Sequence, residues 1–291
     1  PFFDCLTTGQ LSISAGAPYQ PFNRSPQVRF NYKNKGFTGS IAAMYQFQFN
    51  SVGLGGKSNT YQHIAVVPEM VLMLDYKYKN LRFGVGMDYL TIRPRTTSIG
   101  AGDLDYDHNN PEDFNSYNTY RTDETISSLS YIAYLKYSHK MFSVSAKTTL
   151  GNNFTHTLMF GGFGISNTEY IGTDNYGYMK YSYSALTNSA SWLNLSYGKK
   201  FLSNLMIGYT TNLGTKDDDS CFLFFGEGLK IKDMYGISYG FSYNIPHFRL
   251  GVEYQFTRAN YGDGGLSSNG TYASSHGINN HRSLATISYI F

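Results

Sequence analysis

Apolar and polar residues alternate along most of the chain beyond Pro26, with the period of two that is typical of β-strands with one apolar face. The pattern is clearest at 69–90, where two alternating runs are joined by a tight turn. Tight turns of this kind alternate with long polar loops, for example 94–124 and 151–189. The alternation predicts about eleven strands of roughly 9–13 residues, the length that crosses a hydrocarbon layer when tilted.

The last ten residues, Arg282–Phe291, continue this alternation and end on an aromatic residue. In a soluble protein such a half-apolar strand would leave an exposed edge, whereas a closed barrel has none. We therefore predict an all-β protein, a transmembrane antiparallel β-barrel formed by residues 26–291. Because short turns belong on the periplasmic side of outer-membrane barrels, Phe291 is expected on that side, and Pro26–Lys33 is expected to run inward from outside.

The strand count raises a difficulty, because single-chain bacterial barrels have even numbers of strands. Residues 9–16 alternate, but they form a short run of small residues and would make a poor twelfth strand. We expect instead that strands preceding Pro1 complete the barrel. Arg282–Phe291 would then pair with a strand outside this sequence.

The composition agrees with a barrel. Tyr (27), Phe (21) and Gly (30) are abundant and charged residues make up only 15%, as expected for aromatic girdles and tight strand contacts. The mean hydropathy of −0.33 fits strands with one polar face. The best apolar run, Ile64–Leu74, is interrupted by Pro68 and Glu69 and is too short for a transmembrane helix of about 20 residues. The net charge of +3, without a basic run, argues against nucleic acid as a partner.

Two stretches resemble a known family. The run Gly16–Arg29 (GAPYQPFNRSPQVR), followed by a hairpin, and the run Val67–Glu69 (VPE), which opens the next strand, are similar to DcaP-like trimeric outer-membrane porins. The resemblance implies a sixteen-stranded protomer in a homotrimer, with roughly the first third of the barrel preceding this chain.

The same resemblance gives residues 1–25 a role. With sixteen strands, this segment becomes the third external loop, which in trimeric porins folds into the pore and narrows it. Asp4 and Arg24 would then be candidates for the constriction. The alternative is an external loop that packs on the rim of the barrel.

Charged residues on the polar strand faces are candidates for lining a water-filled pore, because a pore selects by its diameter and its charges. The strand phases place these residues inside: Arg29, Glu69, Asp75, Lys77, Arg82, Asp88, Lys136, Lys147, Arg249 and Glu253. Cations outnumber anions, which predicts passive diffusion of small hydrophilic solutes with a preference for anions. The alternative is that these charges only pair across strands and keep the wall solvated.

Catalysis is the less favoured hypothesis, and we predict that the protein is not an enzyme and has no cofactor. An outer-membrane hydrolase would need a nucleophile and a base together at one rim. The histidines fall instead in predicted loops and turns: His63, His108, His139, His156, His247, His276 and His281. The run Gly236–Gly240 (GISYG) matches G-x-S-x-G, but that motif requires a strand-to-helix elbow, and here it lies within one predicted strand.

Two weaker signals concern metal binding and disulfides. Asp103, Asp105 and Asp107 could gather oxygen ligands for calcium, but this loop lacks the glycine and the glutamate of a calcium-binding loop, so we predict no metal site. Cys5 and Cys221 both fall in predicted external segments and could form a disulfide if their geometry allowed it.

The remaining features concern the surroundings of the barrel. Trp192 fits either an indole at the membrane interface or an aromatic packed under a loop. The Tyr-, Asn- and Gly-rich loops would also suit a surface receptor, an adhesin or a component of a larger outer-membrane complex. The expected location is the bacterial outer membrane, in contact with lipid bilayer and lipopolysaccharide.

Overall fold

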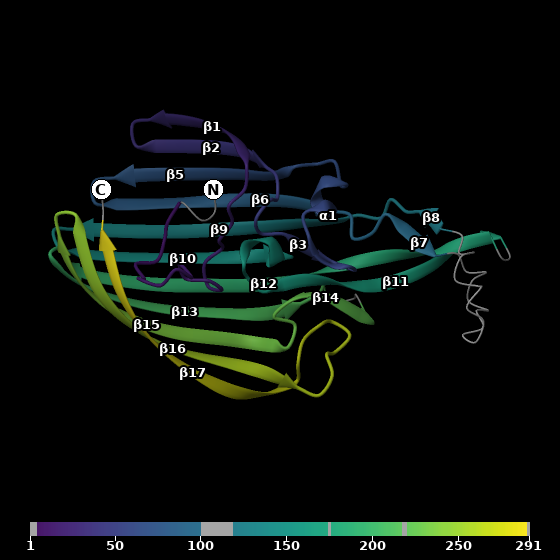
Figure 1. Ribbon diagram of the computed structural model, residues 1–291. Coiled ribbons are helices and arrows are strands. Elements are labelled where there is room, and N and C mark those ends of the chain that lie inside the picture. Colours follow the sequence, from purple (N-terminus) through teal and green to yellow (C-terminus); the bar gives the residue numbers. More distant parts are fainter. Residues whose placement is uncertain (1–4, 100–118, 174–175, 217–219, 290–291) are drawn as a thin grey trace.

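The computed structural model describes residues 5–99, 119–173, 176–216 and 220–289, and its main element is one curved antiparallel β-sheet (Figure 1). Eleven strands pair in an unbroken path through this sheet, which confirms the strand count predicted for this part of the sequence. They are β1 (Gln27–Asn34), β2 (Phe37–Met44), β5 (Glu69–Tyr78), β6 (Leu81–Ile92), β9 (Ile126–His139), β10 (Phe142–Asn152), β12 (Tyr176–Gly198), β13 (Phe201–Gly214), β15 (Ile231–Ile245), β16 (Phe248–Asp263) and β17 (Ser274–Tyr289).

Two-residue turns join five pairs of neighbouring strands at one end of the described sheet, on the left in Figure 1. In the first of these turns Lys35 has φ +43° and Gly36 has φ +91°. Positive φ at both positions gives the turn a twist that matches the flanking strands. We call this end of the sheet the turn end and the opposite end the loop end.

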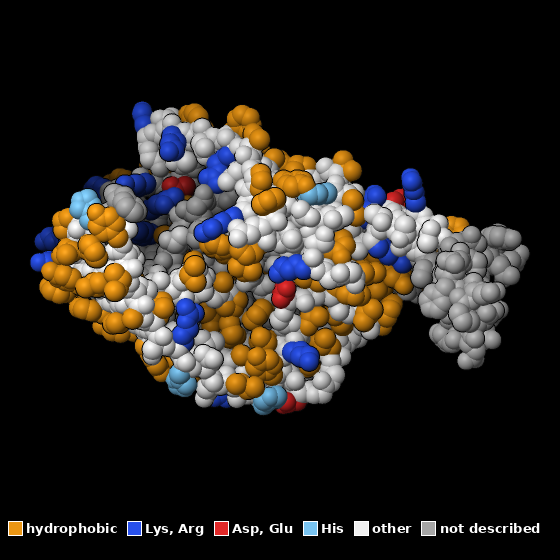
Figure 2. Space-filling view, in the orientation of Figure 1, with side chains coloured by type: hydrophobic (Ala, Val, Ile, Leu, Met, Phe, Trp, Pro, Cys, Tyr) orange, Lys and Arg blue, Asp and Glu red, His pale blue; other side chains and the backbone are white. Residues whose placement is uncertain are grey.

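The two faces of the sheet differ in polarity, as the alternation predicts. Along β16, Phe248, Leu250 and Val252 are exposed on the convex face, whereas Glu253 is buried on the concave face. Exposed apolar side chains recur along the convex face of the long strands, and Figure 2 shows apolar side chains beside the turn end, on the left. A continuous exposed apolar surface of this kind marks a face that contacts a partner or a membrane.

Aromatic side chains gather on the convex face beside the turn end. They are Tyr32, Phe37, Tyr76, Tyr78, Phe83, Tyr137, Phe142, Tyr197, Phe201, Phe241, Phe248 and Tyr289. Rings on neighbouring strands touch, with centroids 5.8 Å apart for Tyr76 and Phe83 and 5.2 Å apart for Phe248 and Tyr289. Such a band is typical of strands that end at a membrane–water interface.

The loop end is more regular than the sequence suggests. The region 151–189, predicted as a loop, contains the short helical turn η3 (Phe154–Thr157), the strand β11 (Gly161–Thr173) and the first half of β12. β11 pairs with β12 and with β14 (Leu223–Glu227), and the β11–β12 hairpin projects from the body of the sheet (Figure 1). The prediction of a loop was wrong here, because Gly- and Tyr-rich strands without alternation give no periodic signal.

The remaining elements are small. They are β3 (Ser51–Gly53), β4 (Gly56–Ser58), α1 (Thr60–His63), β7 (Thr97–Ile99) and β8 (Thr119–Arg121). Within the described ranges, no helix is long and apolar enough to cross a membrane.

The edges of the main sheet are β1 and β17. β1 pairs with β2 and β17 pairs with β16, and these two edge strands are not paired with each other in the described sheet. Residues 9–16 form turns rather than a twelfth strand. The structure therefore shows a curved antiparallel sheet and does not show the closure of a barrel.

Candidate functional site

The concave face of the sheet is covered by residues 5–25, which we call the inner segment. Its main chain is hydrogen-bonded to side chains of widely separated strands. The Lys147 ammonium donates to the Leu6 carbonyl oxygen at 3.1 Å, and the Leu11 N–H donates to Glu253 Oε2 at 2.6 Å. Both charged side chains are buried, so the inner segment is tied to β10 and to β16 by hydrogen bonds to charged groups.

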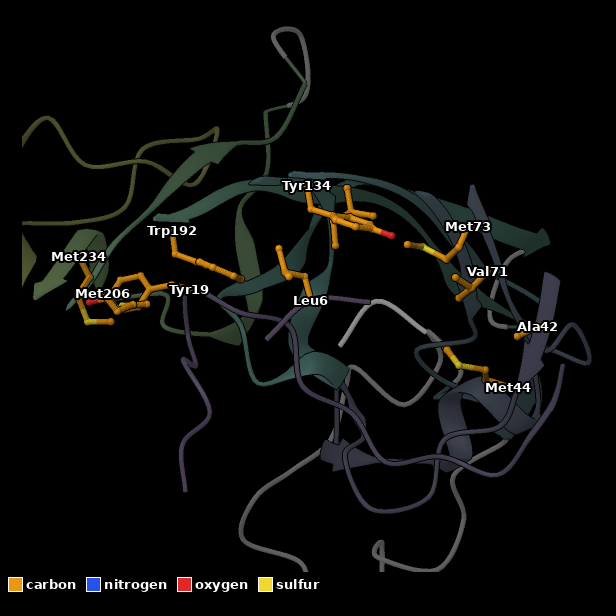
Figure 3. Packing of buried hydrophobic residues seen from close by; sticks show 11 residues of the cluster. Leu6, Tyr19, Ala42, Met44, Val71, Met73, Tyr134, Trp192, Met206 and Met234 are labelled. Atoms are coloured by element: carbon orange, nitrogen blue, oxygen red, sulfur yellow. The ribbon is translucent and has the colours of Figure 1, made fainter. Parts of the chain in front are cut away.

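A cluster of buried apolar side chains, which we call the apolar floor, lies between the inner segment and the concave face of the sheet (Figure 3). Leu6 and Tyr19 pack against buried side chains of the sheet, which are Ala42, Met44, Val71, Met73, Ile132, Tyr134, Trp192, Met206 and Met234. The sequence contains a signal for this floor, because Val71 and Met73 occupy the polar face of their strand. The signal was missed because only the charged residues of that face were considered.

Trp192 is part of this floor and lies away from the membrane interface. The side chain is only 3% exposed, and its Nε1–H donates to Gln20 Oε1 at 2.7 Å. Gln20 Nε2 in turn donates to the Leu6 carbonyl oxygen at 2.9 Å. The interface alternative was wrong, and the alternative of an aromatic under a loop is the one that the structure bears out.

Two glycines, one in β13 and one in β15, leave space for the Tyr19 side chain against the concave face of the sheet. A Cβ atom on Gly208 would lie 2.5 Å from Tyr19 Cγ, and one on Gly236 would lie 2.6 Å from its hydroxyl oxygen. Gly236 and Gly240 lie in the middle of β15, without the strand-to-helix elbow of a hydrolase nucleophile. The close approach of Tyr19 accounts for Gly236 without any catalytic role.

Gly208→Ala is expected to destabilise the protein by about 1–3 kcal/mol, because the new methyl group overlaps the buried Tyr19 ring. Gly240→Ala is the matched control, since its Cβ would meet Glu253 Oε2 at an ordinary 3.6 Å. Urea unfolding of both variants in the same lipid, followed by far-UV circular dichroism, measures the difference. Equal midpoints for the two variants would contradict the close packing of Tyr19 on the wall.

Basic side chains concentrate on the concave face near the turn end. A recess of about 530 Å³ and a second of about 200 Å³ open there. Their charged lining residues are Arg29, Lys33, Lys77, Lys79, Arg82, Lys136 and Asp75, six cations and one anion. Figure 2 shows lysine and arginine side chains gathered in the hollow on the left of the molecule. This end of the concave face therefore carries a positive electrostatic potential.

The single acidic residue of these recesses is paired. Arg82 Nε donates to Asp75 Oδ2 at 2.7 Å, and the Tyr134 hydroxyl donates to the same oxygen. The Arg82 guanidinium also lies 5.6 Å from the Tyr134 ring centroid. Asp75 is thus neutralised locally, which leaves the excess positive charge on the other side chains.

A buried polar cluster lies farther from the turn end. It consists of Glu69 at the start of β5, Asp88 in β6 and His156 in η3, and one ligand atom of each lies within 4.8 Å of the others. His156 Nε2 is 3.4 Å from Glu69 Oε1. His156 was expected in an external loop, and that expectation was wrong. The helical turn η3 packs against the sheet, and this packing buries the imidazole.

Burial lowers the pKa of His156, but the carboxylates of Glu69 and Asp88 outweigh that effect, so the pKa of this histidine is raised. Without another cation, the imidazolium is the positive charge that faces the two acids. Glu69, Asp88 and His156 therefore interact electrostatically as one cluster. The sequence had placed only Glu69 and Asp88 on the inner face of the strands.

The other predicted pore-lining residues have different surroundings. Lys147 and Glu253 face inward but are buried under the inner segment, and Arg249 is half-buried on the concave face. Arg24 is exposed, with its guanidinium 5.4 Å from the Phe22 ring centroid. Asp4 lies outside the described residues, and so do the three calcium candidates, Asp103, Asp105 and Asp107.

The suggested disulfide between Cys5 and Cys221 is not formed. Cys5 lines a recess together with Asp75 and Arg82, whereas Cys221 packs against Gly164 of the β11–β12 hairpin. The two cysteines belong to different parts of the molecule, although the sequence placed both in external segments. The geometry does not allow the bond that the sequence left open, because the early segment folds onto the sheet.

The fold as a whole is similar to two solved bacterial outer-membrane proteins. The outer membrane channel DcaP of Acinetobacter baumannii matches 100% of this chain over 69% of its own, with a TM-score of 0.62 and 13% sequence identity. In-vitro folded OmpT, an outer membrane protein of Vibrio cholerae, matches 100% of this chain over 74% of its own, with a TM-score of 0.53 and 10% identity. No protein-family model and no curated protein matches the sequence. The likeness confirms the similarity to DcaP-type channels expected from the sequence, at the level of the fold.

Proposed function

We propose that this protein is an outer-membrane porin that allows small hydrophilic solutes, preferentially anionic ones, to diffuse passively through a water-filled barrel. One observation carries the proposal. The inner segment (residues 5–25) is fastened across the concave face by buried polar contacts that reach β10, β12 and β16. A segment held in this way is placed to narrow the lumen, as a constriction requires.

The convex face supports a location in the bacterial outer membrane. Exposed apolar side chains alternate with inward-facing residues along the strands, and the aromatic band lies beside the turn end. In water this surface would favour aggregation, whereas lipid tails and lipopolysaccharide satisfy it. The fold similarity to DcaP and OmpT supports the same location.

Closure of the sheet and its assembly are further parts of the proposal. β1 and β17 each have an unpaired edge in the described sheet, and a lipid-facing sheet cannot leave backbone groups unpaired at its edges. The resemblance of the sequence to DcaP-like porins supports a sixteen-stranded barrel and a homotrimer.

The preference for anions rests on the basic end of the concave face. Six cations and one acid, Asp75, line the two recesses there, and Arg82 already neutralises that acid. In a narrow aqueous path with low-dielectric walls, such an excess raises the local concentration of anions. Solutes with carboxylate or phosphate groups are therefore the favoured class.

Lys77→Glu combined with Lys136→Glu is expected to lower the anion-to-cation permeability ratio by about threefold or more, because it replaces two lumen cations by anions. Reversal potentials across planar bilayers under a salt gradient measure this ratio. The control is Lys57→Glu with Lys216→Glu, an equal change of charge at the loop end. An unchanged ratio in the first variant, or an equal change in both, would contradict the proposed path.

A further inference from the structure

Three buried titratable side chains remain outside the proposed path for solutes. Glu69 is 2% exposed, Asp88 is 4% exposed and His156 is 1% exposed. They come from two adjacent strands and from η3, so the fold brings together residues that are up to 87 positions apart (156 − 69). Burial of two carboxylates in one place is strongly unfavourable unless a positive charge accompanies them.

The hydrogen-bonding capacity of this cluster is incompletely used. Among the described atoms, Glu69 Oε2, Asp88 Oδ1 and His156 Nε2 have no hydrogen-bond partner. Buried carboxylate oxygens and imidazole nitrogens are normally hydrogen-bonded or bound to a metal. Three such atoms in one cluster indicate that a ligand completes the site.

A cavity adjoins the cluster. Its volume is about 40 Å³, and it is lined by Pro21, Asn23, Ser25, Gln27, Met44, Glu69, Val71, Asp88, Phe154 and Thr157. This volume exceeds the roughly 10–15 Å³ that one water needs, so an ion with a bound water fits. The described lining of this cavity contains two acidic side chains, Glu69 and Asp88, and no lysine or arginine.

We propose that Glu69, Asp88 and His156 bind one divalent transition-metal ion, with Zn²⁺ as the best fit. A tetrahedral ion about 2.1 Å from each ligand separates neighbouring ligand atoms by about 3.4 Å. His156 Nε2 and Glu69 Oε1 are 3.4 Å apart, and a carboxylate oxygen of Asp88 lies within reach of both. The mixed nitrogen and oxygen ligands favour a first-row transition metal over Mg²⁺ or Ca²⁺, which prefer oxygen ligands alone.

The charge of a divalent ion matches the two carboxylates of the cluster. Such an ion neutralises Glu69 and Asp88 together and is bound by the neutral imidazole of His156. A metal also uses ligand atoms that a proton on His156 leaves unpartnered. The cavity would supply the fourth position for water.

The position of the site gives the metal a structural role. The inner segment contributes Pro21, Asn23 and Ser25 to the cavity wall, and the Phe22 N–H donates to the Thr157 carbonyl oxygen at 2.8 Å next to His156. A metal bound to β5, β6 and η3 therefore fixes the place where the inner segment leaves the concave face. This role is separate from the selection of solutes.

The purified full-length protein, stripped with EDTA and desalted, is titrated with ZnCl₂ by calorimetry and then assayed for retained zinc by mass spectrometry. We expect one Zn²⁺ per chain, with Asp88→Asn and His156→Asn each weakening binding by about tenfold or more. Glu227→Gln and His281→Asn are matched controls, because Glu227 and His281 are exposed and lie outside the cluster. Both controls are expected to bind zinc as the wild type does.

Cobalt in place of zinc keeps the test decisive if the variants fold poorly. Wild-type protein loaded with CoCl₂ is expected to show the intense visible absorption of a four-coordinate nitrogen–oxygen site, and millimolar MgCl₂ is expected not to abolish it. No stoichiometric uptake of Zn²⁺ by the wild type would overturn the proposal. Equal uptake by Asp88→Asn, His156→Asn and the wild type, or displacement by equimolar Mg²⁺, would also overturn it.

Discussion

Replacing residues 8–18 by two glycines is expected to raise the single-channel conductance by about threefold or more, because these residues cross the concave face where the lumen is proposed to be narrowest. The two flanks of the excised stretch are already in contact, since the Gln20 side-chain Nε2 donates to the Leu6 carbonyl oxygen at 2.9 Å. Planar-bilayer recordings of the variant and the wild type in the same salt measure the change.

A deletion of residues 264–268, between β16 and β17, is the control. This stretch belongs to a connection at the loop end, so its loss is expected to leave the conductance near the wild-type value. The role proposed for the inner segment is wrong if excision of residues 8–18 leaves the conductance unchanged while the barrel remains folded. Retention of heat-modifiable migration in gels is the check on folding.

Trp192→Ala is expected to lower the free energy of unfolding by about 3–5 kcal/mol, because it opens a large cavity under the inner segment. The substitution also removes the donor for the buried Gln20 Oε1. Without the indole and its hydrogen bond, the inner segment is expected to become accessible to proteases. Urea unfolding in lipid vesicles, followed by far-UV circular dichroism, measures the loss of stability.

Trp192→Phe separates packing from hydrogen bonding. The phenyl ring fills much of the same space but cannot donate to Gln20, so a smaller loss of about 1–3 kcal/mol is expected. Equal losses for the two substitutions would show that the hydrogen bond, rather than the packing, holds the inner segment. A stability equal to that of the wild type for Trp192→Ala would contradict the stabilising role of the apolar floor.

The strands were predictable because their signal is local. Period-two alternation identified the hairpin at 69–90, which the structure shows as β5 and β6 joined by a two-residue turn. Strand length was underestimated, since β16 (Phe248–Asp263) has 16 residues. The last residues of β16 lie at the loop end, where Arg258 and Asn260 take the positions of the apolar face and the alternation ends.

The candidate sites were less predictable because they depend on contacts that are distant in sequence. Nothing near His156 in the sequence indicates that η3 folds back toward Glu69, since the interaction spans two hairpins. Similarly, the alternation predicts that the Lys147 side chain faces the lumen, but the inner segment covers this side chain. Strand phase gives the face on which a side chain lies, and only the three-dimensional fold gives what lies over it.

The hydrogen bonds of the inner segment also bear on the order of assembly. Each long strand pairs with the next one along the chain, so the sheet can grow by successive hairpins of low contact order. The hydrogen bond between Leu11 and Glu253 instead joins residues 242 positions apart. Its acceptor is not in place until β15 and β16 have formed, and the entropy of closing so long a loop opposes earlier docking. The inner segment is therefore expected to reach its final position among the last parts of the protein.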